Sequence, residues 1–275
     1  MAMRWIFLFL VFAEGVCRAE EVATLEAAFA ASSKGDRTNA LLILNQVVKA
    51  EPSNARAWHA RAQLRAMNGD EEGALTDFTE AIQREPKSPR LVQERAMIYF
   101  RRNEIEKSLI DFDRANELEP RLVPQNWQRG IALYYAGRFA DGRRQFEIHK
   151  TVNPEDVENA AWHFLCSARE LGLEKARNSL IVVQGDTRIP MKEVHQLFAG
   201  LAKPEDVLKA AETTKAAPRD RARHLFYAHL YLGLYFEAAE EHEKAGEHIR
   251  AAAASAPRDD YMGEVARVHA RRLKK

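Results

Sequence analysis

The spacing of four prolines constrains this 275-residue chain more than any other feature of its sequence. Pro52, Pro86, Pro120 and Pro154 follow one another at intervals of 34 residues. A fixed period of this size indicates a repeat architecture, in which each unit buries its apolar face only by stacking on its neighbours. Such a chain is expected to form an extended array of similar units.

Four further columns hold the same phase over the four periods. A turn residue stands 17 positions before each proline, a large apolar residue stands 8 positions before it, and small residues stand 24 and 12 positions before it. In that order the columns are Gly35, Gly69, Asn103 and Gly137; Leu44, Phe78, Phe112 and Phe146; Ala28, Ala62, Ala96 and Gly130; and Ala40, Ala74, Ser108 and Gly142. Agreement of this kind over four periods excludes a chance pattern.

Each column has a physical role in a pair of antiparallel helices. Glycine or asparagine ends the first helix in the left-handed conformation that these residues adopt at low cost. Small residues let the helices approach closely, the large residue fills the space between successive pairs, and proline ends the second helix. The pattern is identified as the tetratricopeptide repeat, and in its best copy Trp58 and Phe78 are expected in the core. The predicted fold is all-α, a tetratricopeptide-repeat superhelical solenoid of antiparallel helix pairs.

The repeats also predict the organisation of the chain. A fifth copy ends at Pro257, although Glu240 stands at its turn position, and the stretch before this copy lacks the repeat columns. The predicted parts are 1–19, a signal peptide; 20–154, four tetratricopeptide repeats; 155–219, a degenerate repeat with irregular short helices; 220–257, the C-terminal tetratricopeptide repeat; and 258–275, a helix that caps the last repeat.

Proline and glycine positions predict four helices within the degenerate stretch. The first begins at Asn153 and Pro154, with asparagine as its cap, and stops at Gly172. The second starts at Leu173 and ends near Val183. The last two open with prolines and cover 190–199 and 204–213.

Residues 1–19 are typical of an export signal. Arg4 gives a basic start, and the apolar stretch 5–13 is too short to span a bilayer, which needs roughly 20 apolar residues. Ala19 is expected to be the last residue removed. The three residues before Cys17 include a charge and a β-branched side chain, which argues against lipid attachment. We therefore expect an exported protein, periplasmic or secreted, without a lipid or transmembrane anchor.

The charge balance argues against a nucleic-acid-binding protein, and the cysteine content argues against a disulfide-rich one. Lys and Arg number 41 against 40 Asp and Glu, so the chain lacks the basic excess through which nucleic acid is bound. Two cysteines, Cys17 and Cys166, do not make a disulfide framework. Cys166 follows Phe164 and Leu165, which predicts a buried and unreactive thiol.

The sequence contains no motif of an enzyme. It has no Gly-rich phosphate loop, nucleophile elbow or dinucleotide fingerprint, so we predict no catalytic residue and no cofactor. Four histidines near the C-terminus lie among glutamates, which leaves a metal-binding hydrolase as an alternative from another functional class. Their intervals do not give the i,i+4 pair of a helical metal site. These histidines are His224, His229, His242 and His248.

The first helix of each pair is expected to line the concave face of the solenoid. Its outward positions predict a groove with guanidinium groups toward one end and aromatic side chains toward the other. Interfaces favour Arg, Trp, Tyr and Met, so we expect the groove to bind a partner protein or peptide that places acidic groups near the arginines. The predicted groove residues are Arg56, His59, Gln63, Met67, Arg90, Gln93, Met97, Arg101, Trp127, Ile131, Tyr134 and Tyr135.

Four repeats in phase, a degenerate stretch and one more repeat resemble the layout of the NlpI family of bacterial envelope lipoproteins. The strings 130–139, 195–208 and 231–235 carry most of the likeness. The resemblance implies a homodimeric, non-catalytic adaptor that brings peptidoglycan hydrolases together with an envelope protease or with synthases. Members of that family are lipid-anchored, whereas the sequence before Cys17 departs from an anchor motif. The alternative among binding proteins is a structural subunit of an envelope or secretion complex.

Overall fold

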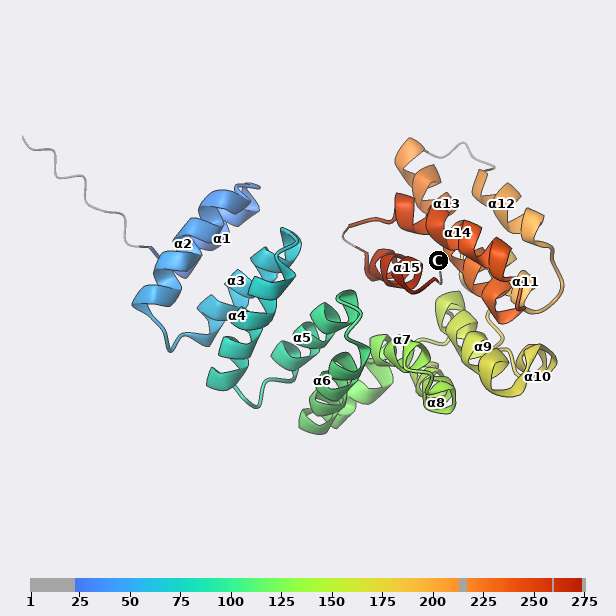
Figure 1. Ribbon diagram of the computed structural model, residues 1–275, viewed down its shortest axis with the longest axis horizontal. Helices are drawn as coiled ribbons and strands as arrows, with labels where there is room; N and C mark the ends of the chain where they lie inside the picture. Colours follow the sequence, from blue (N-terminus) through green and yellow to red (C-terminus); the bar gives the residue numbers. More distant parts are fainter. Residues whose placement is uncertain (1–22, 213–216, 259, 274–275) are drawn as a thin grey trace, which may run out of the picture.

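The computed structural model describes the chain except for residues 1–22, 213–216, 259 and 274–275. The described residues form α-helices and one 3-10 helix, and no strand occurs among them (Figure 1). The all-α solenoid expected from the period is therefore confirmed. The predicted signal peptide and Cys17 lie outside the described residues.

The N-terminal part consists of antiparallel helix pairs that stack in sequence order. Its elements are α1 (Leu25–Ser33), α2 (Arg37–Ala50), α3 (Ala55–Met67), α4 (Glu71–Arg84), α5 (Pro89–Arg101), α6 (Ile105–Leu118), the 3-10 helix η1 (Pro120–Gln125), α7 (Trp127–Tyr135) and α8 (Phe139–His149). The pairs form a curved array, in which α5 and α7 lie on the inner side and α6 and α8 on the outer side (Figure 1).

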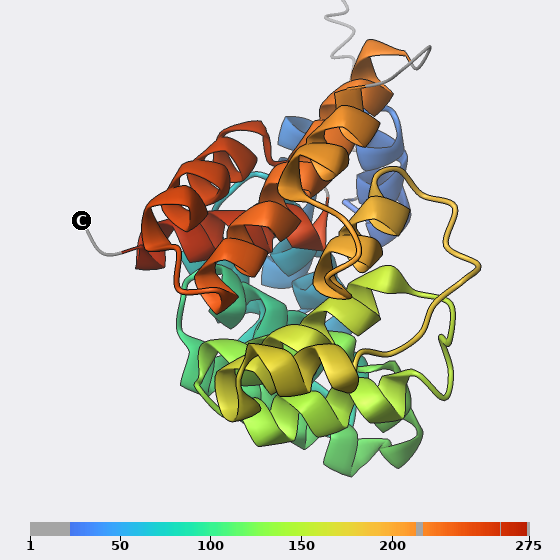
Figure 2. The same cartoon turned by 90° about the vertical axis from the view of Figure 1, so that its right-hand side faces the viewer.

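The C-terminal part is less regular and turns back over the middle of the array. Its elements are α9 (Val157–Leu171), α10 (Leu173–Asn178), α11 (Met191–Phe198), α12 (Pro204–Glu212), α13 (Pro218–Ala238), α14 (His242–Ser255) and α15 (Tyr261–Arg272). Helices α13 and α14 form the last helix pair, and α13 also packs on α9 and α12. Figure 2 shows these orange and red helices above the yellow-green α9.

The last repeat keeps the left-handed turn conformation of the other copies, although its residue at the turn position is Glu240 instead of Gly or Asn. Gly35, Gly69 and Gly137 have φ values of 81°, 84° and 75°. Asn103 has a φ of 61° and Glu240 a φ of 62°. Glu240 therefore takes the left-handed conformation that glycine takes in other copies, at a cost of about 1–2 kcal/mol for a residue with a Cβ atom. Packing of α13 on α14 imposes the turn in spite of this cost.

The small and large columns meet between the two helices of a pair. A Cβ atom added to Gly130 would lie 2.6 Å from the ring of Phe146, and one added to Gly233 would lie 2.7 Å from Ile249. Real carbon atoms do not approach this closely, so only glycine fits at these two positions. Phe112, from the same large column, is fully buried. The columns thus fix the distance between paired helices.

The two residues expected in the core of the best repeat differ in burial. Phe78 is buried, whereas Trp58 is only partly buried. The indole Nε1 of Trp58 donates to the carbonyl of Pro52 at 3.0 Å. The guanidinium groups of Arg61 and Arg84 each lie 4.9 Å from the centre of the indole ring. A ring with a polar edge and cations over its faces suits a position at the surface of the repeat.

A column of arginines, absent from the pattern described above, joins each repeat to the one before it. Arg95 of α5 donates to both carboxylate oxygens of Asp111 on α6, at 2.8 and 2.9 Å, and to the hydroxyl of Thr79 on α4 at 3.1 Å. The arrangement recurs at intervals of 34 residues, in Arg61 with Asp77 and Asn45, in Arg129 with Gln145 and Asp113, and finally in His163 with Glu147.

The degenerate stretch departs from its predicted boundaries. α9 begins at Val157 rather than at Pro154, because the carboxylate of Asp156 caps the helix from outside its first turn. α10 is shorter than predicted, and the segment between α10 and α11 has no helix. Arg188 ties this segment to the start of α9 through an ion pair with Asp156.

The terminal helix α15 packs on α14 and also reaches across the curve to α5. In Figure 1 it lies on the inner side of the array. Arg271 donates to the carbonyl of Arg101, and Arg272 donates to the carbonyl of Tyr135 at 3.0 Å. The helix that follows the last repeat therefore occupies part of the concave face.

Candidate functional site

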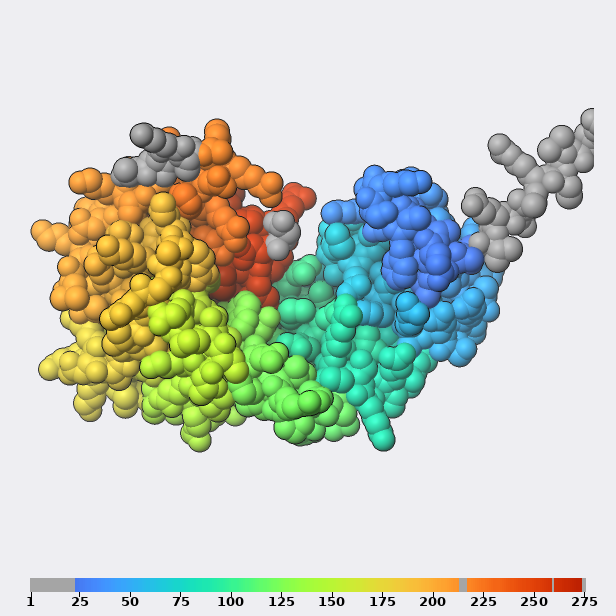
Figure 3. Space-filling view, turned by 180° about the vertical axis from the view of Figure 1, so that it is seen from behind, coloured from blue at the N-terminus to red at the C-terminus, as the bar shows by residue number. Residues whose placement is uncertain are grey.

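The predicted groove residues lie on the inner helices α3, α5 and α7, and their surroundings divide them into three groups. A recess separates the N-terminal helices from the C-terminal helices, as the space-filling view from behind shows (Figure 3). Six predicted residues on α3 and the first half of α5 keep exposed or partly exposed side chains. We call these six the open groove: Arg56, His59, Gln63, Met67, Arg90 and Gln93.

Glu94 of α5 organises the middle of the open groove. One of its carboxylate oxygens lies 2.8 Å from Nε2 of His59 and accepts from Gln63 at 2.8 Å, while Arg90 donates to the other oxygen at 2.7 Å. Burial raises the pKa of Glu94, but the hydrogen bonds from His59 and Arg90 outweigh it and hold this pKa below its usual value. The carboxylate is therefore charged and joins α3 to α5. Met67, which is 59% exposed, adds an apolar position at the end of α3.

The second group is covered by the chain's own terminal helix. The ring of Trp127 meets that of Tyr261 edge-on, with centroids 5.1 Å apart, and Tyr261 stacks on Phe100 of α5 at 5.5 Å. Nε of Arg101 lies 3.6 Å from a carboxylate oxygen of Glu264 on α15. The concave face of α5 and α7 thus binds a helix through stacked rings and an ion pair.

The remaining predicted groove residues belong to the core. Ile131 is fully buried, and Tyr134 and Tyr135 are more than nine-tenths buried. The hydroxyl of Tyr134 donates to Glu237 of α13 at 3.0 Å. Met97 is partly buried against the same cluster. The aromatic end predicted for the groove is therefore internal, because α13 and α15 turn back onto α7 in a contact that the repeat period does not encode.

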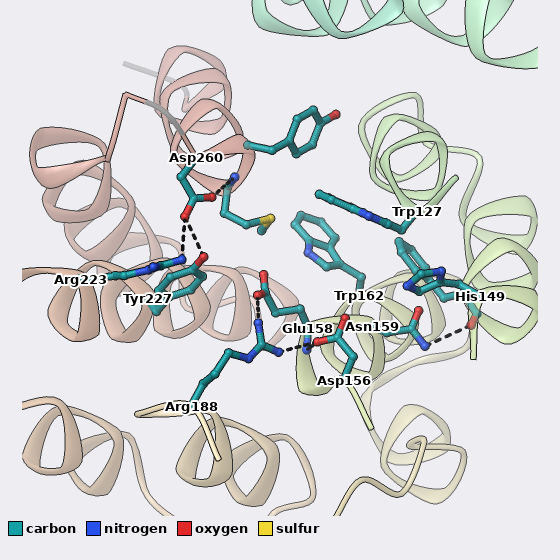
Figure 4. Close-up of a pocket in the computed structure, with 13 residues that line it drawn as sticks. Trp127, His149, Asp156, Glu158, Asn159, Trp162, Arg188, Arg223, Tyr227 and Asp260 are labelled. Carbon is teal, nitrogen blue, oxygen red and sulfur yellow. Dashed lines mark hydrogen bonds and ion pairs between the residues drawn. The ribbon is translucent and has the colours of Figure 1, made fainter. Parts of the chain in front are cut away.

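A pocket lies where α7, α9, α13, α15 and the segment before α11 meet (Figure 4). Its volume is about 420 Å³, which falls within the range of small-ligand sites. Four aromatic side chains, Trp127, Trp162, Tyr227 and Tyr261, form much of its wall. We call it the junction pocket.

Arg188 is the centre of an ion-pair network along one wall of the junction pocket. Its guanidinium donates to Asp156 and Asp186 at 2.6 Å and to Glu158 at 2.5 Å. Tyr231 donates to the other oxygen of Glu158 at 2.9 Å. Burial raises the pKa of Glu158 to about 7, although Arg188 acts in the opposite direction. One guanidinium shared by three carboxylates does not compensate the buried charge of Glu158.

Asp260 carries the negative charge of the opposite wall. Its carboxylate accepts from the hydroxyl of Tyr227 at 2.9 Å and, as the cap of α15, from the amide of Met262 at 2.8 Å. Nη2 of Arg223 lies 3.6 Å from the same carboxylate. Acidic groups therefore face the cavity from two sides.

Three polar atoms at the junction pocket have no hydrogen-bond partner among the described residues. They are Nε1 of Trp162, Oδ1 of Asn159 and the hydroxyl of Tyr261. Trp162 is 1% exposed and Asn159 is 4% exposed, and a buried polar atom left unpaired costs about 1–3 kcal/mol. Figure 4 shows the indole of Trp162 reaching toward the middle of the pocket, with Asn159 beside it.

Among the residues that line this pocket, Trp127 alone was predicted as a binding residue. The available signal was the polar start of α9, where Asp156, Glu158 and Asn159 precede Trp162. Nothing in the sequence indicates which distant segments meet that start.

The other chemical candidates were histidines and a cysteine. The Nδ1 atoms of His229 and His248 lie 2.9 Å apart, and burial lowers the pKa of both residues. Within the described part of the chain, no three His, Cys, Asp or Glu side chains come together as metal ligands. Cys166 is buried, as predicted, and burial raises the pKa of its thiol. None of the helices in the described ranges is both long and apolar enough to cross a bilayer.

Residues 25–89 match the family model described as tetratricopeptide repeat. A tetratricopeptide repeat protein from Parabacteroides merdae superposes with a TM-score of 0.61 at 18% identity, over 89% of this chain and 96% of that one. The MamA protein superposes with a TM-score of 0.54 at 14% identity, over 70% of this chain and 94% of that one. No curated protein matches the sequence. The chain thus contains tetratricopeptide repeats and has the fold of a tetratricopeptide-repeat solenoid, a scaffold that generally serves protein–protein interaction without catalysis.

Proposed function

We propose that this protein is an exported, non-catalytic adaptor that binds partner proteins or peptides in the open groove. The observation that carries the proposal is the position of α15, which packs on the concave face at α5. Its contacts with Phe100, Trp127 and Arg101 support the proposal, because a face whose curvature accepts one helix can accept another. The open groove continues the same face along α5 and α3, beside the place that α15 occupies.

The side chains of the open groove define the chemistry of the partner. Arg56 and Arg90 are exposed, and Arg90 keeps 71% of its side chain accessible although it is paired with Glu94. Guanidinium groups bind carboxylates in two-pronged hydrogen bonds, so the partner segment carries acidic residues at this place. The exposed thioether of Met67 adds an adaptable apolar contact. An amphipathic helix or extended segment with acidic and apolar residues fits these features.

The location of the adaptor and its clients are part of the same proposal. Residues 1–19 have the pattern of an export signal, and the layout of the repeats resembles the NlpI family. Both features support a periplasmic or secreted adaptor whose clients are peptidoglycan hydrolases or an envelope protease. The resemblance also supports a homodimer.

Site-specific photocrosslinking tests the adaptor proposal. p-Benzoyl-phenylalanine is placed at Gln93 in the open groove and, as a control, at the exposed Arg114 of α6. We expect a protein adduct in the envelope fraction from the Gln93 position and none from the Arg114 position. Equal labelling from both positions, or none from either, contradicts the open groove as the binding surface. Recovery of the chain outside the envelope and the medium contradicts export.

A charge-reversal pair separates binding chemistry from stability. Arg56→Glu with Arg90→Glu is expected to reduce the crosslink at least tenfold, since two like charges across an interface cost several kcal/mol. The matched control is Arg114→Glu with Arg121→Glu, because both arginines are exposed and paired with a nearby glutamate. Circular dichroism confirms that both double variants keep their helices. Unchanged crosslinking in the first pair would remove the arginines from the proposal.

A further inference from the structure

The junction pocket is built from residues that the open groove does not include, so an inference about it holds or fails independently of the proposed function. The pocket joins α7, α9, α13, α15 and the segment before α11, and its volume of about 420 Å³ accommodates one large side chain or a molecule of similar size. The charges, the aromatic side chains and the unpaired polar atoms of the pocket together indicate the chemistry of its ligand.

The charges of the junction pocket leave an excess of carboxylates. Three carboxylates and two guanidinium groups line the pocket. Arg188 pairs with Asp156 and Glu158 and is also shared with Asp186, and Arg223 lies next to Asp260. This balance favours a cationic ligand and disfavours an anionic one. Burial is the main cause of the raised pKa of Glu158, and the neighbouring charge of Asp156 adds to it. The three lining carboxylates are Asp156, Glu158 and Asp260.

The aromatic wall adds a second attraction for cations. Trp127, Trp162, Tyr227 and Tyr261 line the pocket together with the carboxylates. The faces of such rings carry negative charge density and attract a guanidinium or ammonium group, most strongly when water is excluded. Arginine is the cation that stacks on indole and phenol rings most readily.

The unpaired polar atoms specify the rest of the ligand. Oδ1 of Asn159 accepts hydrogen bonds, and a guanidinium supplies five N–H donors. Nε1 of Trp162 can only donate, and a guanidinium has no acceptor for it. A peptide carbonyl supplies that acceptor. A ligand with both N–H donors and a carbonyl oxygen satisfies these two atoms.

We propose that the junction pocket binds an arginine side chain presented by a peptide. The guanidinium lies among the acidic and aromatic walls and donates to Asn159, while the Trp162 indole donates to a carbonyl of the peptide backbone. The site therefore recognises a basic residue, in contrast to the open groove, whose arginines attract acidic ones.

Indole signals in nuclear magnetic resonance spectra test the proposal on the full chain. The chain has four tryptophans, and replacing Trp5, Trp58 and Trp127 by Phe one at a time assigns every signal, leaving that of Trp162. The probe is N-acetyl-arginine amide. We expect it to shift the Trp162 signal saturably, with a Kd on the order of 1 mM. The Trp58 signal stays in place, because its Nε1 already donates to Pro52.

One neutral analogue and one anionic analogue test whether the pocket recognises the charge of its ligand. N-acetyl-citrulline amide has the shape of the arginine probe without its charge, and N-acetyl-glutamate amide reverses the charge. We expect the citrulline derivative to bind at least tenfold more weakly, which corresponds to about 1.4 kcal/mol, and the glutamate derivative not to bind. Equal binding of citrulline, tighter binding of glutamate, or no saturable shift at Trp162 overturns the proposal.

Variants of the chain place the interaction in the pocket. Glu158→Gln and Asp260→Asn each remove one carboxylate with little change of shape, and each is expected to weaken the arginine probe several-fold. Asp141→Asn, on the outer helix α8, is the matched control and leaves binding unchanged. If one pocket variant fails to fold, the other and the citrulline comparison on the unaltered chain still decide the question. Unchanged affinity in a folded Glu158→Gln variant contradicts the assigned site.

Discussion

The hydroxyl of Tyr135 on α7 lies 2.9 Å from Nδ1 of His269 on α15, a contact between residues 134 positions apart in the chain. His269 is buried, and its Nε2 lies 3.6 Å from Glu237 of α13. Burial lowers the pKa of His269, although Glu237 acts in the opposite direction, so the imidazole is neutral in the folded state at neutral pH. This small polar cluster holds the terminal helix on the concave face.

Acidification is therefore expected to loosen α15. The folded pKa of His269 is below its usual value of about 6.5, so the unfolded helix binds the proton more readily. Its contribution to stability is present above pH 6.5 and is lost as pH falls below that value. Hydrogen exchange of α15 amides at pH 7.5 and 5.5, corrected for the intrinsic rate, measures the effect. His269→Gln serves as control, because glutamine does not titrate; an equal loss of protection in this variant contradicts the assignment.

Glu158 predicts the opposite pH dependence. Its folded pKa of about 7 is above the value of about 4.5 expected without burial, so the folded state holds the proton more tightly. Stability from this group is fully present below pH 4.5 and is lost as pH rises through 7. We expect urea unfolding to show a loss of about 2–3 kcal/mol between pH 5 and 8 that Glu158→Gln lacks. A parallel decline in both proteins would show that other groups cause it.

The arginine column predicts that replacing one of its arginines destabilises the chain much more than replacing an exposed arginine. Arg95→Met leaves the carboxylate of Asp111, which is 6% exposed, without its guanidinium partner. A buried charge left in this way costs about 3–5 kcal/mol. Arg114→Met removes an exposed pair with Glu117 and is expected to cost no more than about 1 kcal/mol. Urea midpoints measure both variants, and equal midpoints would mean that the column does not stabilise the array.

The contacts that a repeat period can indicate are those made within one repeat or between neighbouring repeats. Gly130 and Phe146 belong to columns 16 positions apart, and the same interval separates Arg95 from Asp111. The arginine column repeats at 34 residues like the other columns, so the period alone could have indicated it. Local geometry fixes such pairs, because each helix can only pack against the next.

The junction pocket was not predictable in this way. It brings Trp162 of α9 together with Arg188 of the irregular stretch, Tyr227 of α13 and Asp260 at the start of α15. Their meeting depends on how far the array turns after α8 and on the path of the segment before α11. No column of the repeat specifies the turn of the array after α8 or the path of that segment. For the same reason the sequence predicted Tyr134 in the groove, whereas α13 covers it.

Glu240 is the exception to the turn column, and replacing it by glycine is expected to stabilise the chain. Glu240→Gly places the residue that the other copies use at a φ of 62° and is expected to stabilise the chain by about 1 kcal/mol. Gly69→Ala is the matched control, because a Cβ atom there meets nothing within 4 Å and the change tests the backbone conformation alone. It is expected to destabilise by a similar amount. Urea unfolding of both variants measures the two free energies. A loss of stability in Glu240→Gly would mean that the glutamate side chain contributes more than the left-handed backbone costs.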